Sequence, residues 1–124
     1  MKQNVAILLF DEVEVLDFAG PYEVSAKTDE LLGYETFNVF TVACPGPAGM
    51  AAPKGPIRAR NGLSVNPDHD FASCPAPHLL IVPGGFGTRA LLKNEAALSW
   101  IRTTAASAEL VMSVCTGSLV LAKA

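Results

Sequence analysis

One stretch of the chain, residues 110–118, constrains the fold more than any other. It begins as an apolar run typical of a buried strand and reaches Cys115 between small residues. Apolar residues resume at 119–122 among good helix formers. This pattern of a strand, a one-residue corner and a helix is that of a nucleophile elbow. Ser113 and Gly117 must be small there, because a bulky side chain would collide with the turn. The sequence therefore predicts that the Cys115 sulfur projects at the carboxyl end of a strand, where a helix dipole favours a thiolate.

Three further apolar runs, at residues 5–10, 37–43 and 79–82, are typical of buried strands. Helical patterns separate several of these runs from one another and from the strand that precedes Cys115. Strands that alternate with helices specify a parallel sheet covered on both faces. We therefore expect an α/β fold, arranged as a three-layer sandwich with a mainly parallel sheet.

Local signals place the ends of the helices and one hairpin. Gly33 is a candidate C-cap for the first helix, and Pro21 either opens the regular part of that helix or kinks it. Asn94 is a candidate N-cap for a helix over residues 95–107. The Asn61-Gly62 dipeptide predicts a small hairpin within residues 57–65. A surface loop is expected at residues 45–56, which are rich in Pro, Gly and Ala.

Composition narrows the class of protein. Half of the 124 residues are hydrophobic and 17% are charged, which is typical of one compact, well-buried domain. A net charge of −3 without a Lys/Arg cluster argues against nucleic acid as the main partner. The start of the chain does not resemble a signal peptide, and no apolar stretch approaches membrane-spanning length. Three widely spaced cysteines form neither a disulfide framework nor a zinc pattern, so a reducing, cytoplasmic setting is expected.

Three segments of the predicted sheet meet at its carboxyl edge, where ligands bind in folds of this kind. They carry Asp17 after the first strand, Gly84 and Gly85 after the third, and Cys115 after the last. Glycines there let backbone N–H groups approach a ligand closely, as in an oxyanion hole. Taken singly, the aspartate reads as a solvated helix-start acid, the glycines as an ordinary turn and the cysteine as a core residue. The case for a site rests on their coming together.

Four segments of this chain resemble the ThiJ/PfpI superfamily. They are residues 5–10, the Leu-Asp-Phe-Ala-Gly-Pro motif at 16–21, the Val-Pro-Gly-Gly turn at 82–85 and the Ser-Val-Cys-Thr-Gly-Ser motif that opens residues 113–122. The resemblance implies a flavodoxin-like fold of the class I glutamine amidotransferase type. These motifs are similar to those of isonitrile hydratases and of the amidotransferase-like domains of AraC-type regulators. Many members carry Glu where this chain has Asp17, which favours the hydratase and regulator branch.

The resemblance to isonitrile hydratases implies a lyase with a cysteine nucleophile and a small-molecule substrate. Cys115 would attack the terminal carbon of an isonitrile to form a thioimidate, and hydrolysis would release an N-substituted formamide. Asp17 would serve as general acid and base, and Thr116 would hold the reacting group or the water through its hydroxyl and N–H. Gly84, Gly85 and Gly117 would complete the oxyanion and substrate site. No metal and no organic cofactor is implied.

The resemblance leaves other functions open. A ligand-sensing domain of an AraC-type regulator is the alternative from another class, and nucleic acid would then be a partner only through a C-terminal DNA-binding domain. Aldehyde handling and redox sensing need only a reactive Cys115. Members of the family are commonly homodimers, so we expect a homodimer. His69 and His78 precede the elbow and match no catalytic histidine of the family, so we expect both on loop surface.

Members of this superfamily also continue past the elbow, whereas this chain stops at Ala124, inside the helix that follows Cys115. We therefore expect residues 1–124 to form a single ThiJ/PfpI-type domain that is C-terminally truncated. Its sheet would then be incomplete and would need a further piece or a partner to cover its apolar faces.

Overall fold

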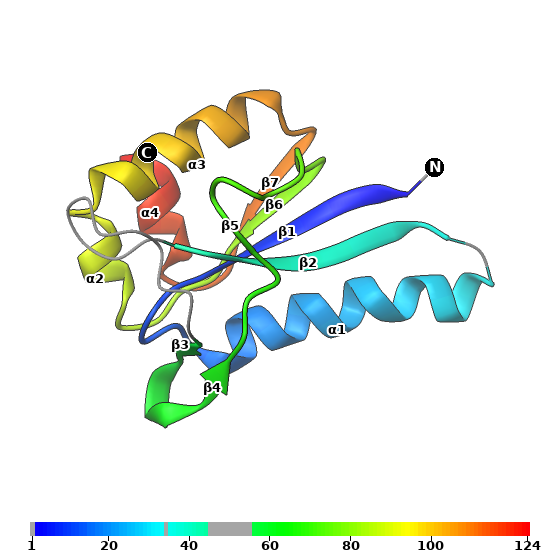
Figure 1. Ribbon diagram of the computed structural model, residues 1–124, viewed down its shortest axis with the longest axis horizontal. Helices are drawn as coiled ribbons and strands as arrows, with labels where there is room; N and C mark the ends of the chain where they lie inside the picture. The colour runs from blue at the N-terminus through cyan, green and yellow to red at the C-terminus, as the bar shows by residue number, and fades with distance from the viewer. Residues whose placement is uncertain (1, 34, 45–55) are drawn as a thin grey trace.

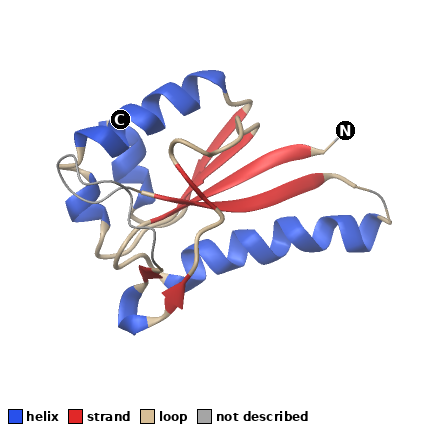
Figure 2. Cartoon of the chain, viewed as in Figure 1, coloured by secondary structure: helices blue, strands red, loops and turns tan. Residues whose placement is uncertain are grey.

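A five-stranded sheet forms the centre of the chain, as Figures 1 and 2 show. The computed structural model describes residues 2–33, 35–44 and 56–124, so the loop expected at 45–56 lies outside the described residues except for Pro56. The strand order is β5-β2-β1-β6-β7, and every neighbouring pair is parallel. The strands are β1 (Gln3–Leu9), β2 (Phe37–Ala43), β5 (His69–Asp70), β6 (Leu79–Val82) and β7 (Leu110–Ser113).

Helices cover the sheet on both faces. The long helix α1 (Val15–Leu32) lies along one face, and α3 (Glu95–Ser107) and α4 (Gly117–Lys123) lie on the other, with the short α2 (Thr88–Leu91) beside them (Figure 1). A parallel strand needs a crossover before the next one, and these helices supply the crossovers from β1 to β2 and from β6 to β7. The predicted α/β three-layer arrangement with a mainly parallel, flavodoxin-like sheet is confirmed.

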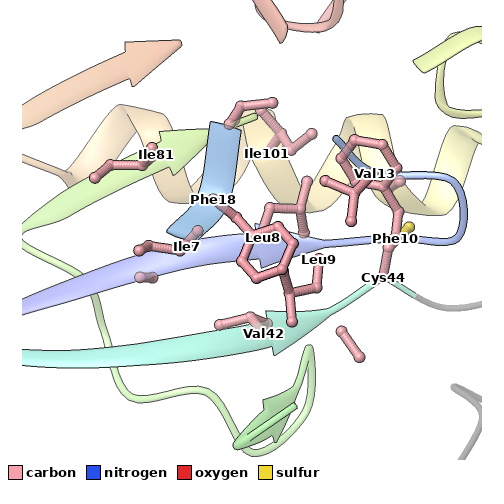
Figure 3. Packing of buried hydrophobic residues seen from close by; sticks show 14 of the residues in the cluster. Ile7, Leu8, Leu9, Phe10, Val13, Phe18, Val42, Cys44, Ile81 and Ile101 are labelled. Carbon is pink, nitrogen blue, oxygen red and sulfur yellow. The ribbon is translucent and has the colours of Figure 1, made fainter. Parts of the chain in front are cut away.

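The core is built around β1, the middle strand. Its residues from Val5 onward are fully buried because helices pack on both sides of it. Figure 3 shows Ile7, Leu8 and Leu9 of this strand within the packed cluster. Phe18 of α1 and Ile101 of α3 are buried in the same cluster. Full burial of one such side chain contributes about 1.5–3 kcal/mol to the free energy of folding. This core sets the position of the strand ends, where the polar residues gather.

The helix signals in the sequence hold with one difference. Gly33 ends α1 in the left-handed region at φ 74°, and its N–H donates to Asp29 O (3.0 Å). The Asn94 side chain caps α3 by accepting from Ala97 N (3.1 Å). Pro21, however, does not open the helix, because it lies inside α1, which begins at Val15; the alternative, a kink at Pro21, stays a prediction. Asp17 therefore lies in the first turn of this helix.

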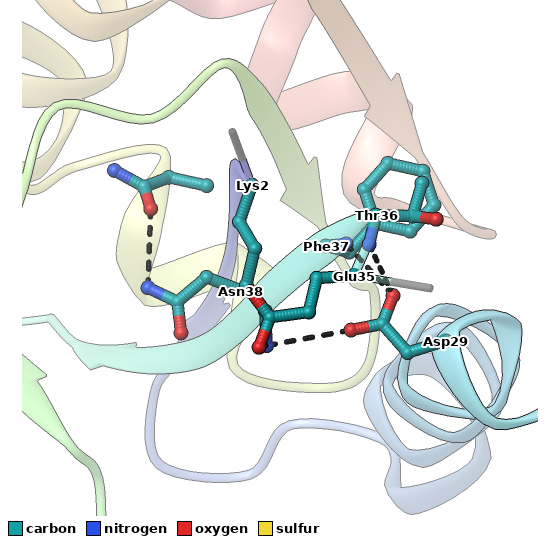
Figure 4. Close-up of polar contacts among 7 residues, drawn as sticks. Lys2, Asp29, Glu35, Thr36, Phe37 and Asn38 are labelled. Carbon is teal, nitrogen blue, oxygen red and sulfur yellow. Dashed lines mark hydrogen bonds and ion pairs between the residues drawn. The ribbon is translucent and has the colours of Figure 1, made fainter. Parts of the chain in front are cut away.

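A polar cluster at the amino edge of the sheet joins the end of α1 to the start of β2 (Figure 4). Asp29 Oδ1 accepts from the N–H groups of Thr36 (2.6 Å) and Phe37 (3.0 Å), and Asp29 Oδ2 lies 3.4 Å from Lys2 Nζ. These backbone hydrogen bonds, and then the Lys2 ammonium, hold the pKa of Asp29 below its ordinary value. Both Asp29 oxygens are thus paired, while the buried Thr36 hydroxyl has no hydrogen-bond partner among the described residues, and the cluster serves as a structural joint.

The predicted hairpin forms between β3 (Ile57–Arg58) and β4 (Ser64–Val65), which pair antiparallel. Asn61 and Gly62 both take positive φ values, 67° and 93°, as a type I′ dipeptide does. The connection is longer than two residues because a 3₁₀ turn, Arg60–Gly62, sits between the strands. The hairpin lies beside the start of α1 (Figure 1).

The two histidines are more structural than the sequence indicated. His69 was expected on a loop, yet it begins the edge strand β5, where it pairs with Val42 and its ring meets the ring of Phe40 edge-on at 5.0 Å. His78 stays in a loop but is half-buried, and its Nδ1 accepts from Asn4 N (2.8 Å). A two-residue strand is too short to show a periodic pattern, so β5 could not be predicted from the sequence.

Candidate active site

Three turns meet at the carboxyl edge of the sheet, and hydrogen bonds tie them together. The turn after β1 joins the turn after β6 through Glu14 N, which donates to Gly84 O (2.9 Å), and through a bridge between Val13 and Gly85. The turn after β7 joins the end of β6 through Val114 N, which donates to Val82 O (3.0 Å). The convergence predicted for the three segments is therefore present.

Cys115 occupies a strained corner between β7 and α4. Its φ is 54°, in the left-handed region, which costs an L-residue about 1–2 kcal/mol. Hydrogen bonds on either side hold the corner, from Gly117 N to Val114 O (3.0 Å) and from Ser118 N to Cys115 O (3.3 Å). The cysteine is exposed, whereas Gly117 is buried and a Cβ there would overlap the carbonyl oxygen of Val82. The corner therefore presents the thiol and allows α4 to pack against β6.

Asp17 lies in the first turn of α1 and is half-buried. Its Oδ2 accepts from Gly84 N (3.2 Å), so the carboxyl group is fixed to the turn that follows β6. A contact between Asp17 and the Cys115 sulfur, direct or through one water, stays a prediction.

Thr116 and Gly85 form the second side-chain link across the site. Gly85 N donates to Thr116 Oγ1 (3.1 Å), and Thr88 Oγ1 donates to Gly85 O (2.8 Å). Gly85 has a φ of 124°, a conformation open to glycine alone among common residues. The N–H groups of Gly84 and Gly85, expected as oxyanion donors, are thus already engaged by Asp17 and Thr116. Across residues 2–33, 35–44 and 56–124, the N–H of Thr116 donates to no other group.

A pocket of about 210 Å³, open to solvent, lies directly over the corner. It is lined by Glu14, Gly85, Phe86, Arg89, Cys115 and Thr116. The glycine, the cysteine and the threonine were expected from the sequence, whereas Glu14, Phe86 and Arg89 were not. Their spacing was the only available signal, since Glu14 stands one helical turn before Asp17, and Phe86 and Arg89 follow the glycine turn. Charged residues at such positions ordinarily face solvent and carry no motif.

The other two cysteines sit in different surroundings. Burial, and then the Asp11 carboxylate, raises the pKa of Cys44 to about 12. Burial, and then the Asp70 carboxylate, raises the pKa of Cys74 to about 11. Both groups therefore stay protonated near neutral pH, where a thiol is a poor nucleophile. Cys115 is the exposed member of the three.

A larger cavity of about 330 Å³ lies between α1, β2 and β4. Phe18, Tyr22, Thr41 and Asp68 are among its lining residues, and neither Cys115 nor Asp17 is. Asp68 Oδ2 is occupied by the N–H (2.9 Å) and hydroxyl of Thr41. The chemistry-bearing groups lie at the smaller pocket, which we take as the candidate active site.

The described residues form neither a membrane-spanning helix nor a cluster of metal ligands. None of the helices they form is both long and apolar enough to cross a bilayer. No three His, Cys, Asp or Glu side chains in this part of the chain gather closely enough to hold a metal ion.

Comparison with known proteins gives two kinds of relative by sequence. The isonitrile hydratase of Pseudomonas putida is 35% identical over 124 residues, which cover 100% of this chain and 48% of the hydratase. The HTH-type transcriptional regulator GbdR of Pseudomonas aeruginosa is 27% identical over 122 residues, which cover 98% of this chain and 31% of the regulator. The chain thus spans about half the length of the hydratase and about a third of the regulator.

Solved structures agree in fold. A ThiJ/PfpI family protein from Pseudomonas syringae superposes with a TM-score of 0.77 at 25% identity, covering 99% of this chain and 46% of that one. DJ-1 of Schizosaccharomyces pombe superposes with a TM-score of 0.73 at 11% identity, covering 97% of this chain and 62% of that one. The sequence profile of the DJ-1/PfpI family matches residues 3–124. With a match of that extent, supported by the elbow and by the shared fold, the chain belongs to the DJ-1/PfpI family.

Proposed function

We propose that this chain is a cytoplasmic, cysteine-dependent enzyme that adds water to an isonitrile to give an N-substituted formamide. One observation carries the proposal. The exposed thiol of Cys115 and the side chain of Thr116 share one pocket, and Asp17 is hydrogen-bonded to the glycine turn that borders it. The 35% identity with the isonitrile hydratase of Pseudomonas putida supports this choice of substrate class.

Before the reaction, Cys115 and Asp17 together hold one proton, because two neighbouring anions would raise each other's energy. The thiolate sulfur bonds to the terminal carbon of the isonitrile, and that carbon takes the proton from Asp17, which gives a thioimidate. Asp17, now ionised, takes a proton from water as the water oxygen bonds to the same carbon. The second water proton passes to nitrogen, the carbon–sulfur bond breaks with its electron pair on sulfur, and the formamide leaves.

The surrounding groups have positioning tasks in this scheme. The bond from Gly84 N to Asp17 Oδ2 leaves Oδ1 to carry the proton. The bond from Gly85 N to Thr116 Oγ1 orients the threonine, whose own N–H is the remaining donor for a developing negative charge. Gly117 keeps α4, and with it the corner, close to β6.

Substitution of Asp17 tests the mechanism. Asp17→Asn keeps the shape but removes the transferable proton, so we expect kcat for isonitrile hydration to fall by about 10²–10⁴. Alkylation of Cys115 by iodoacetamide should persist in this variant, whereas Cys115→Ser should abolish both reactions. Asp70→Asn is the matched control, because the Asp70 carboxylate also accepts a backbone N–H, that of Ser73 (2.7 Å), away from the pocket. Near-full activity of Asp17→Asn would refute the proposed acid.

A second candidate is the ligand-sensing domain of a transcriptional regulator, which the 27% identity with GbdR favours. A sensor would bind a small molecule in the Cys115 pocket without turning it over. Calorimetry against isonitriles, combined with detection of formamide, separates the two functions. Binding without product assigns the sensor, and product that depends on Cys115 assigns the enzyme.

We also propose that the chain forms a homodimer. Helix α1 carries exposed apolar side chains, with Leu16 78%, Val24 71% and Leu31 82% accessible. Apolar residues spaced in this way on one helix are typical of an interaction surface. Light scattering should give twice the chain mass, and Val24→Glu should shift that value toward the monomer. A monomer at all concentrations would contradict the proposal.

A further inference from the structure

The lining of the Cys115 pocket includes an aromatic ring with two guanidinium groups over it. The Cζ atoms of Arg60 and Arg89 lie 4.0 and 5.0 Å from the centroid of the Phe86 ring. Phe86 and Arg89 line the same pocket as Cys115. Cation–π contacts of this kind hold a guanidinium in place without neutralising its charge.

The two arginines over this ring differ in their ion pairing. Arg60 is paired with Glu12, with 2.9 Å between Arg60 Nη1 and Glu12 Oε2. Within the described part of the chain, no carboxylate lies within 4 Å of the Arg89 guanidinium. The other charged residue of the pocket, Glu14, is the exposed N-cap residue of helix α1, and its side chain makes no capping hydrogen bond. Arg89 is therefore the cation of the pocket, and within the described residues it has no carboxylate partner.

The backbone that carries Arg89 is firmly held. Thr88 N and Thr88 Oγ1 both bond to Gly85 O (3.2 and 2.8 Å), and Arg89 N donates to Phe86 O (3.3 Å). Thr88 is buried, with 3% of its surface exposed. These bonds fix the backbone position from which the exposed Arg89 side chain reaches the pocket.

We infer that the substrate of Cys115 carries a carboxylate, which Arg89 binds through the planar fork of its guanidinium. The inference rests on the proposed function for the reacting group but assigns a new feature, the anionic end of the molecule. A pocket of about 210 Å³ is small for a ligand site, so a short isonitrile bearing one carboxylate is the class it suits. Arg89 is a specificity residue in this view and takes no part in the proton transfers.

The first experiment does not depend on hydration. Iodoacetate and iodoacetamide both alkylate a thiolate, whose sulfur bonds to carbon as iodide leaves, but only iodoacetate is an anion. The alkylated Cys115 peptide is quantified by mass spectrometry, which separates it from Cys44 and Cys74. A hydrogen bond to a charged group is worth about 1.5–3 kcal/mol, or about 10- to 100-fold in rate. We expect Arg89→Gln to slow iodoacetate by about that factor and iodoacetamide by less than about 2-fold, with Arg89→Lys in between.

Arg102→Gln is the matched control, because Arg102 is an exposed arginine of α3 that does not line the pocket. It should leave both alkylation rates unchanged. If Arg89→Gln leaves the ratio of the two rates unchanged, or lowers both rates equally, Arg89 does not select anions and the inference is overturned.

The second experiment compares isocyanoacetate with its neutral methyl ester as hydration substrates. We expect the wild-type chain to prefer the carboxylate, and Arg89→Gln to lose about 10- to 100-fold in kcat/KM for it while the ester changes by less than about 3-fold. Preference for the ester would overturn the inference, and so would preference for a quaternary ammonium isonitrile, which would assign the polar end to Glu14. If neither compound is hydrated while the alkylation ratio still depends on Arg89, the hydratase proposal fails and the anion site stands.

Discussion

Cys44 and Cys115 both follow parallel strands at the same edge of one sheet, yet they are opposite in character. Cys44 continues the line of β2, its N–H donates to Leu9 O (2.8 Å), and its sulfur is buried beside Asn94 Nδ2 at 3.8 Å. Cys115 leaves the line of β7 through a positive φ and is exposed. The comparison shows that position at the strand end does not by itself expose a thiol. The corner, which turns the side chain out of the core, makes the difference.

Thiol labelling against pH gives the largest expected contrast between the two. A thiol whose pKa is about 12 is ionised in about one molecule in 10⁴ at pH 8, whereas an ordinary thiol is ionised in about one in four, so Cys44 should react about 10³-fold more slowly. Because the shift is upward, Cys44 labelling should appear only as the pH rises toward 12 or when the chain unfolds. Cys74, with a pKa of about 11, should be labelled at lower pH than Cys44 and therefore before it. Mass spectrometry of labelled peptides checks the order, and earlier labelling of Cys44 would contradict it.

A change at Gly117 tests whether the corner itself produces the reactive thiol. The Cβ of Gly117→Ala would overlap the Val82 carbonyl, so α4 must shift at a cost of about 1–3 kcal/mol in the free energy of unfolding. We expect Cys115 labelling to slow as the corner moves. Gly20→Ala is the matched control, because nothing lies within 4 Å of a Cβ there and alanine favours helix α1 by up to about 1 kcal/mol. Denaturant unfolding with parallel labelling gives both values, and equal behaviour of the two variants would refute the steric account.

Asp29, at the amino edge of the sheet, offers the smallest effect and a contrast with the site. Its pKa is lowered, so its contribution to stability is present above the ordinary carboxyl range near pH 4 and is lost as the pH falls through the lowered value. Asp29→Asn should lower Tm at pH 7 and flatten the acid dependence, while Cys115 labelling stays unchanged. Glu35→Gln, at the other carboxylate near Lys2 (3.8 Å), is the control. A Tm loss as large for Glu35→Gln would show that the Lys2 pairing matters more than the backbone bonds.

Many features of this fold follow from short-range patterns in the sequence. Apolar runs with helices between them specify the parallel sheet, Asn94 and Gly33 mark helix ends, and small residues flank Cys115 because a corner allows nothing larger. Each of these features depends on neighbours within a few residues. They could therefore be predicted from the chain alone, together with the edge of the sheet at which Asp17, the glycine turn and Cys115 meet.

The identity of the residues that line the pocket depends on tertiary contacts. Glu14, Phe86 and Arg89 carry no motif and acquire a place only because two turns, far apart in sequence, are tied together by backbone hydrogen bonds. The same contacts engage the N–H groups of Gly84 and Gly85 with Asp17 and Thr116. A backbone donor satisfies whichever acceptor packing brings near, and burial sets the pKa of a thiol such as Cys44 in the same way. Local sequence records neither distance nor burial, so these features were decided by how the elements pack.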